Sequence, residues 1–237
     1  RTYLARRGLR DETLRAFQVG YARDSWEALG SYLRSQGWRE ADLLQAGLII
    51  EREGGGGSYD RFRRRVIFPI RDARGHVTGF GGRVLDDSQP KYLNTPQTPV
   101  FDKGSVLYGI DLAREAIRRS ETAVLVEGYM DVLMAHQAGF ANVVAAMGTA
   151  LGQAQLATLK PITRRLVLAL DADVAGDQAT LRGLEVAREA LEQRVVPVVT
   201  PQGLIRYEAE LDAELRILTL PAGRDPDDVI RTDPAAW

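Results

Sequence analysis

The segment TAVLVEGYMD, which runs from Thr122 to Asp131, sets the architecture of this chain. Its first half is a short apolar run rich in β-branched residues, which is typical of a central strand in a parallel sheet. The run ends at the carboxylate of Glu127 and a turn glycine, and a helix is expected to begin near Tyr129. One acid therefore follows a strand directly and a second lies about one helical turn later, at the edge where open α/β sheets bind ligands.

Two later apolar runs end in the same way. Residues 166–170 lead into Asp171-Ala172-Asp173, and residues 215–220 lead into the segment PAGRDPDD at 221–228. Parallel strands place their carboxyl ends at one edge, so we expect six carboxylates to meet there. They are Glu127, Asp131, Asp171, Asp173, Asp225 and Asp227. Crowded carboxylates repel one another unless cations neutralise them, and hard oxygen ligands suit Mg²⁺ or Mn²⁺.

A purely structural interpretation stands beside this one. An Asp that follows a strand is often a helix N-cap or a favourable charge at the positive end of a helix dipole. That alternative stays open for each acid taken singly. Three acidic groups at three strand ends in one chain favour the other interpretation, a metal site for phosphoryl chemistry.

Length and composition narrow the class of protein. The chain has 237 residues, enough for one large domain or two modest ones, and its 45% hydrophobic and 27% charged content is typical of soluble globular proteins. No apolar segment is long enough to span a membrane. The chain contains no Cys, so no disulfide or zinc ribbon can lie within it. It begins at Arg1 rather than Met, and we expect it to be an excised part of a longer protein.

The charge is unevenly divided along the chain. Residues 1–120 carry 21 Lys/Arg and 15 Asp/Glu, whereas residues 121–237 carry 10 and 17. A basic half next to an acidic half suits a polyanion held across a metal cluster. The densest basic segment has four arginines in the five positions 61–65, which makes it a candidate for phosphate contacts. A solvated basic edge is the alternative.

The basic half predicts a mixed α/β region. Residues 1–50 predict several small helices, one of them capped by Ser25, because leucines recur at helical spacing and glycines interrupt them. Residues 66–70 and 76–80 flank a turn signal and predict an antiparallel hairpin. The glycine pair at 81–82, inside a strand pattern, indicates close approach of backbone or of a ligand.

The acidic half predicts alternating strands and helices. A strand at 143–145 and a helix at 151–159 follow the first strand–helix pair, and a helix after Asp173 is expected to run to about Arg194. Together with the acidic strand ends, this pattern predicts a small parallel sheet flanked by helices. Residues 195–214 break the pattern and predict an inserted hairpin, or a strand with a short helix.

These motifs resemble a known family. The acidic half, with EGYMDV at 127–132, DAD at 171–173 and DPD at 225–227, is similar to the Toprim domain shared by primases and topoisomerases. The upstream half resembles the RNA polymerase domain of bacterial DNA primase. The motifs that carry this second resemblance are YDRFR (59–63), FPIRD (68–72), GFGGR (79–83), PKYLN (90–94) and FDKG (101–104).

The resemblance implies a domain plan and a function. Residues 1–120 correspond to the N-terminal basic subdomain of the primase core, and residues 121–232 to a Rossmann-like Toprim subdomain. The zinc-binding domain, the helicase-binding domain and the C-terminal helical subdomain of that family are not expected within this chain. The implied activity is synthesis of short RNA primers on single-stranded DNA from ribonucleoside triphosphates, in the bacterial cytoplasm at the replication fork. The implied partners of the full-length protein are the replicative helicase and single-strand-binding protein.

The resemblance also assigns roles to residues. It implies that Glu127, Asp171 and Asp173 are the catalytic acids and principal ligands of two or more Mg²⁺ or Mn²⁺ ions, with Asp131, Asp225 and Asp227 completing the cluster. Arg83, Lys91, Asn94 and Lys103 are expected to bind nucleotides, and Arg61, Arg63 and Arg64 to follow the template backbone.

Two rival functions remain. One is another Toprim enzyme, a nuclease or topoisomerase, although a topoisomerase needs a nucleophilic Tyr in an additional domain. The other is a non-catalytic scaffold that binds DNA or a partner protein, which loss of the acids would favour. All six acids are present.

Overall fold

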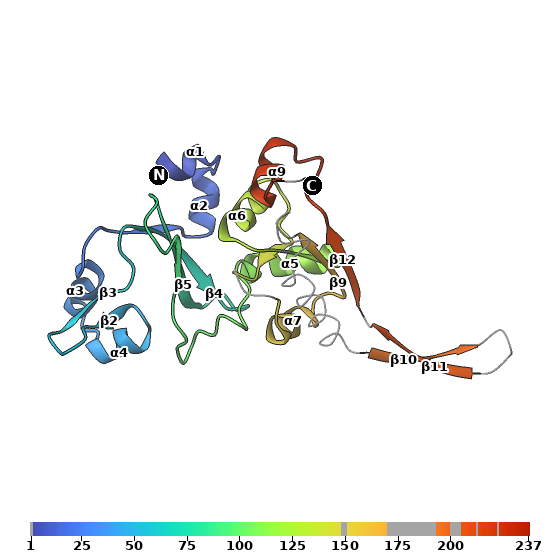
Figure 1. Cartoon of the computed structure of the whole chain (residues 1–237), viewed down its shortest axis with the longest axis horizontal. Coiled ribbons are helices and arrows are strands. Elements are labelled where there is room, and N and C mark those ends of the chain that lie inside the picture. Colours follow the sequence, from blue (N-terminus) through green and yellow to red (C-terminus); the bar gives the residue numbers. More distant parts are fainter. Residues whose placement is uncertain (1, 148–150, 170–192, 200–204, 212, 222) are drawn as a thin grey trace. The chain divides into compact units, whose positions relative to one another are not determined.

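The chain forms two compact units, Arg1–Asp111 and Leu112–Trp237. The computed structural model describes residues 2–147, 151–169, 193–199, 205–211, 213–221 and 223–237 (Figure 1). The predicted α/β class is confirmed, with a mixed first unit and a parallel sheet flanked by helices in the second. Among the described residues, no helix is both long and apolar enough to cross a bilayer.

The first unit joins small helices to an antiparallel sheet. The sheet has the order β1-β4-β5-β6, and a separate pair of strands, β2 and β3, forms a second small sheet. The predicted small helices and the central hairpin are confirmed, whereas the strands of three residues were too short to show a periodic pattern. The elements are α1 (Thr2–Arg6), α2 (Asp11–Ala16), β1 (Gly20–Ala22), α3 (Ala28–Ser35), α4 (Glu40–Gln45), β2 (Ile49–Glu51), β3 (Ser58–Asp60), β4 (Arg65–Arg71), β5 (Val77–Val84) and β6 (Tyr92–Asn94).

Glycines in β5 make room for the aromatic core of this unit. A Cβ at Gly79 would lie 2.7 Å from the ring of Phe101, and a Cβ at Gly82 would lie 2.9 Å from the ring of Phe62. Both phenylalanines are buried. The glycine pair at 81–82 predicted close approach of backbone or of a ligand. At Gly82 the group that approaches is the Phe62 side chain of the protein itself.

The cap of α3 comes from a distant part of the chain. Asp60, at the end of β3, accepts hydrogen bonds from the backbone N–H of Leu29 at 2.6 Å and of Gly30 at 2.8 Å. The prediction that Ser25 caps this helix was wrong, because Ser25 Oγ accepts from Glu27 N, at 3.3 Å and outside the helix. Asp60 is 2% exposed, so its carboxylate satisfies helix donors that water cannot reach.

We expect the replacement Asp60→Ala to lower the free energy of unfolding of the first unit by about 1–3 kcal/mol, because it leaves two backbone donors unsatisfied. Ser25→Ala is the matched control, and its effect should stay below about 0.5 kcal/mol. Urea unfolding followed by circular dichroism measures both. Equal losses in the two variants would contradict the assignment of Asp60 as the cap.

The second unit is built on a parallel sheet of order β12-β9-β7-β8. All three pairings are parallel, as the apolar strand runs predicted. Helix α5 starts at the boundary with the first unit. The elements are α5 (Ile110–Ser120), β7 (Thr122–Val126), α6 (Tyr129–Gln137), β8 (Val143–Ala145), α7 (Gln153–Leu159), β9 (Arg165–Ala169), β10 (Gln193–Val199), β11 (Ile205–Leu211), β12 (Glu214–Leu218) and α9 (Pro226–Thr232).

Helices cover both faces of this sheet. Helices α6 and α9 pack against each other on one face, and α7 lies on the opposite face (Figure 1). This arrangement follows from right-handed crossovers, since the chain moves outward from β7 to β8 and then back past β7 to β9. The core side chains of α6 and β8, among them Val132, Leu133 and Val144, are fully buried.

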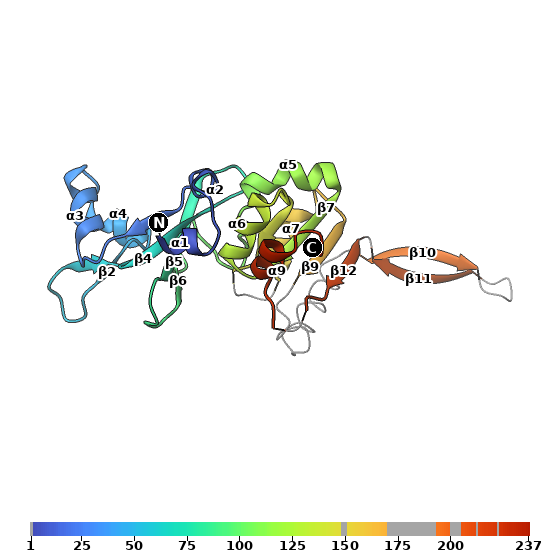
Figure 2. The same ribbon diagram turned by 90° about the horizontal axis from the view of Figure 1, so that it is seen from above.

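The inserted segment forms a hairpin. Strands β10 and β11 pair antiparallel from Gln193↔Leu211 to Val199↔Ile205, and Figure 2 shows them extending as one ribbon beyond β12. The expectation of an extra hairpin is confirmed. The expected end of the preceding helix, at about Arg194, was wrong, because β10 already begins at Gln193.

His136 is a buried histidine in α6. Its Nε2 lies 2.9 Å from the carbonyl oxygen of Val143, the first residue of β8. Burial lowers the pKa of the imidazole below its ordinary value, and the bond to Val143 opposes this only in part. The unfolded chain therefore binds a proton at His136 more readily than the folded chain does.

Stability of the second unit is consequently expected to fall as the pH drops below about 6.5, the ordinary pKa of histidine. His136→Gln keeps a donor for the Val143 carbonyl but does not titrate, so it should flatten this part of the pH profile. His76→Gln, which changes the exposed histidine of the first unit, should not. Thermal unfolding between pH 5 and 8 measures all three proteins, and an unaltered profile in His136→Gln would contradict this origin.

Candidate active site

The carboxyl ends of the four parallel strands meet at one edge of the second sheet. The pairs Val126↔Ala145, Leu125↔Leu168 and Leu218↔Ala169 bring the last residues of neighbouring strands level with one another. Glu127 follows β7 directly and is half-buried. The first predicted acid therefore lies where the sequence placed it.

Asp131 connects two acidic segments at this edge. Its Oδ2 accepts a hydrogen bond from the backbone N–H of Gly128 at 3.0 Å, and its Oδ1 accepts one from the backbone N–H of Asp227 at 3.2 Å. As a whole, Asp131 is 8% exposed. The structure thus brings the turn after Glu127 and the beginning of α9 together through one side chain.

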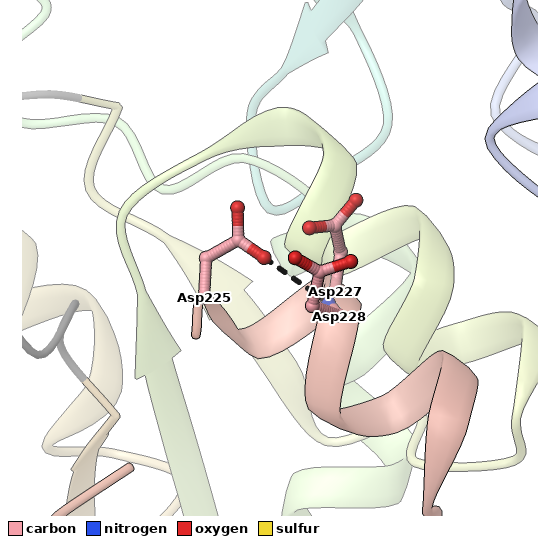
Figure 3. Close-up of side chains that lie close together, drawn as sticks. All are labelled: Asp225, Asp227 and Asp228. Carbon is pink, nitrogen blue, oxygen red and sulfur yellow. Dashed lines mark hydrogen bonds between the residues drawn. The ribbon is translucent and has the colours of Figure 1, made fainter. Parts of the chain in front are cut away.

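Three further acids gather at the N-terminus of α9. One carboxylate oxygen from each of Asp225, Asp227 and Asp228 lies within 4.8 Å of the other two (Figure 3). Asp225 is the N-cap and accepts from Asp228 N at 3.1 Å, so the structural interpretation of this acid also holds. Asp227 is 2% exposed, and Asp228 forms an ion pair with Arg231 at 2.6 Å.

Asp228 was not among the six acids selected from the sequence. The sequence feature that could have identified Asp228 is its position directly after Asp227, in the first turn of a helix. Asp171 and Asp173 lie outside the described residues. The strand that precedes them, β9, lies between β7 and β12 and ends at Ala169, two residues before Asp171.

The chemistry of these donors fits a hard divalent cation. Carboxylate oxygens are the donors that Mg²⁺ and Mn²⁺ prefer, and one of the gathered carboxylates, that of Asp227, is buried. A buried carboxylate needs a compensating positive charge or strong hydrogen bonds. The chain offers no thiolate, so a structural zinc site of the cysteine type does not fit it.

In the first unit, the guanidinium of Arg83 lies close to two aromatic rings. The guanidinium carbon lies 4.9 Å from the ring centroid of Tyr3 and 5.5 Å from that of Tyr92. Its Nε and Nη1 are buried, with no hydrogen-bond partner among the described residues. Buried donors of a charged group are costly to leave unsatisfied. An anion would supply the missing acceptors.

The other predicted nucleotide contacts lie near Arg83 or after β6. Arg83 pairs with Tyr92 across β5 and β6, and Asn94 pairs with Gly81 on the same two strands. Lys91 precedes β6 and is exposed. Lys103 is half-buried in the turn that the carboxylate of Asp102 closes by accepting from Gly104 N at 3.0 Å.

The arginines at 61–65 are engaged with the protein to different degrees. Arg61 donates to the carbonyl oxygen of Asn94 at 3.2 and 3.1 Å, and burial lowers the pKa of its guanidinium. The guanidinium of Arg63 stacks 4.0 Å from the ring centroid of Trp26.

Arg65 donates to Pro90 O at 2.8 Å. Arg64 is 61% exposed and pairs only loosely, at 3.5 Å or more, with two acids.

Family models match both parts of the chain. The model described as the N-terminal domain of the DNA primase catalytic core matches residues 1–114, and a Toprim domain model matches residues 121–199. A DNA primase from Clostridium acetobutylicum is 44% identical over 229 residues, which cover 97% of this chain and 34% of that protein. The chain therefore spans about a third of the length of this relative.

Solved structures of DNA primase domains resemble this chain in both sequence and fold. A DNA primase domain from Pseudomonas aeruginosa is 40% identical with a TM-score of 0.82, covering 98% of this chain and 67% of that one. A DnaG primase catalytic domain solved with bound single-stranded DNA is 36% identical with a TM-score of 0.80, covering 98% and 67%.

The fold and the acidic sheet edge thus define a Toprim-containing protein with a primase-type N-terminal region. The chain belongs to the DnaG family of DNA primases, as part of the catalytic core.

Proposed function

We propose that this chain is the catalytic part of a DNA primase, a DNA-directed RNA polymerase that makes short RNA primers on single-stranded DNA. The observation that carries the proposal is that β7, β9 and β12 end level on a parallel sheet, with Glu127 directly after β7 and Asp131 bonded to Asp227, in a chain whose first half matches the primase catalytic core. In this scheme residues 1–120 form the basic subdomain and residues 121–232 the Toprim subdomain.

Glu127, Asp171 and Asp173 are proposed as the catalytic acids and principal ligands of Mg²⁺ or Mn²⁺, with Asp225 and Asp227 completing the set. Such ions, when bound, lower the pKa of an attacking hydroxyl and neutralise the charge of a leaving phosphate. The protein's part is to bring these carboxylates to one sheet edge, which reduces the reorganisation that ion binding would require.

Cationic side chains of the first unit are proposed to hold the nucleic acid and the nucleotides. Arg83 would bind phosphate through its buried nitrogens, and Lys91, Asn94 and Lys103 would contact ribonucleoside triphosphates. Arg61, Arg63 and Arg64 are assigned to the template backbone, and the DNA-bound relative supports a template site on this family of folds. In the longer protein, the replicative helicase and single-strand-binding protein are the proposed partners.

The replacement Glu127→Gln tests the acidic edge. The amide keeps the shape but removes the charge, so synthesis of RNA on single-stranded DNA with ribonucleotides and Mn²⁺ should fall at least about a hundredfold, in the range of losing one electrostatic contact to the transition state. Glu115→Gln, on the exposed side of α5, removes the same charge and should leave synthesis unchanged.

The products of the same assay distinguish the rival functions. RNA at the parental level from Glu127→Gln would contradict the catalytic assignment. Nicked DNA without RNA would favour a nuclease or topoisomerase-like enzyme. Binding of DNA without any product would favour a scaffold.

A second test addresses Arg83. Arg83→Met keeps much of the side-chain volume next to the two tyrosines but removes the charge, so affinity for ATP in the presence of Mn²⁺ should fall about tenfold or more. Arg74→Met removes the same charge from an exposed turn of the first unit and is the control. Equilibrium dialysis with radiolabelled ATP measures both, and equal affinities for the two variants would rule out Arg83 as a phosphate contact.

A further inference from the structure

We infer that Asp131 is a positioning residue, which fixes the turn after Glu127 against the N-terminus of α9, and that it is not itself an ion ligand. The inference rests on the proposed function, because it concerns how the acids of the same site are arranged. It differs from the role that the sequence assigned to Asp131, that of a further metal ligand.

Asp131 joins the turn after Glu127 to α9 through two hydrogen bonds, and the first of them lies at the start of α6. Asp131 occupies the third position of the helix, and its Oδ2 reaches back to the N–H of the N-cap Gly128 at 3.0 Å. This bond closes the turn that begins at Glu127, so it limits the directions in which the Glu127 side chain can leave the sheet. A Cβ at position 128 would lie 2.9 Å from the same oxygen, which explains why a glycine suits the N-cap.

The second half joins segments that are 96 residues apart in the sequence. Asp131 Oδ1 accepts from the N–H of Asp227 at 3.2 Å in a buried environment. That N–H belongs to the first turn of α9, where backbone donors have no partner within the helix. The bond therefore sets where the first turn of α9, with Asp225 and Asp227, lies relative to Glu127.

This geometry leaves little of Asp131 for an ion. Each carboxylate oxygen already accepts a backbone hydrogen bond, and the residue is 8% exposed. The acids close enough to share a cation in the described part of the chain are Asp225, Asp227 and Asp228, without Asp131. Two N–H donors and the positive end of α6 are the kind of environment that stabilises a structural carboxylate.

The two roles predict opposite effects on the metal-free protein. An acid that serves only to bind a cation repels its neighbours when the cation is absent, so removing its charge raises or preserves stability. An acid that joins two backbone segments stabilises the metal-free fold, so removing it lowers stability. The stability of the metal-free protein therefore distinguishes the two roles of Asp131 without any catalytic assay.

The experiment compares Asp131→Asn with Asp227→Asn in EDTA and in Mn²⁺. Asp131→Asn, whose amide group faces one of the two donors, should lower the metal-free melting temperature and speed amide exchange at Asp227. Asp227→Asn should leave the metal-free melting temperature unchanged or raise it. In Mn²⁺ titrations followed by electron paramagnetic resonance, Asp131→Asn should keep the parental number of sites with affinity weakened about tenfold to a hundredfold.

Gly128→Ala supplies an independent variant that keeps the Asp131 charge. Its Cβ displaces the carboxylate, and it should lower metal-free stability and Mn²⁺ affinity in the same direction as Asp131→Asn. A metal-free melting temperature that is unchanged or higher in Asp131→Asn, with loss of an Mn²⁺ site, would overturn the inference. If the parental protein bound no Mn²⁺, the proposed function would fail, whereas the metal-free comparison would still decide the role of Asp131.

Discussion

The parallel pairing of β9 with both β7 and β12 is the constraint on which the candidate site depends. The pairs Leu125↔Leu168 and Leu218↔Ala169 fix the register, so all three strands end at the same level of the sheet. Side chains that follow these strands must then share one edge, whatever their separation in the sequence. A shift of register in either pairing would change the level at which Glu127 lies relative to Asp225 and Asp227.

Crowded carboxylates oppose this arrangement, and the backbone offsets part of their repulsion. Asp131 accepts from two N–H groups, and Asp225 accepts from Asp228 N as the N-cap of α9. Helix N-termini carry partial positive charge, which favours anions placed there. The acids are thus both candidate ligands and structural caps, and the two interpretations that the sequence left open are compatible at a residue such as Asp225.

The sequence predicted what depends on local pattern and missed what depends on distant partners. Apolar runs and the acids that follow them are local features, so the strands of the second unit and the position of Glu127 could be predicted. The cap of α3 could not be predicted, because Asp60 lies about thirty residues beyond the helix start. The local sequence pattern favoured the nearby Ser25 instead. The link from Asp131 to Asp227 is equally non-local.

Arginines were predictable as a cluster, but their individual contacts were not. Within residues 61–65, Arg61 donates to a strand carbonyl, Arg63 lies over an indole ring, and Arg64 is largely exposed to solvent. Those already held by the protein lose less conformational freedom when they meet a ligand. The sequence therefore indicated a basic surface, and the structure distinguishes ordered guanidinium groups, such as those of Arg61 and Arg63, from the exposed Arg64.

Anomalous X-ray diffraction at the manganese edge, from crystals of this chain soaked in MnCl₂, tests the convergence of the acids most directly. The account predicts an anomalous peak between the carboxyl end of β7 and the first turn of α9, with oxygens of Glu127 and of Asp171 or Asp173 around it. Ordered carboxylates with no peak among them, or Asp171 and Asp173 on the far side of the sheet from Glu127, would contradict it.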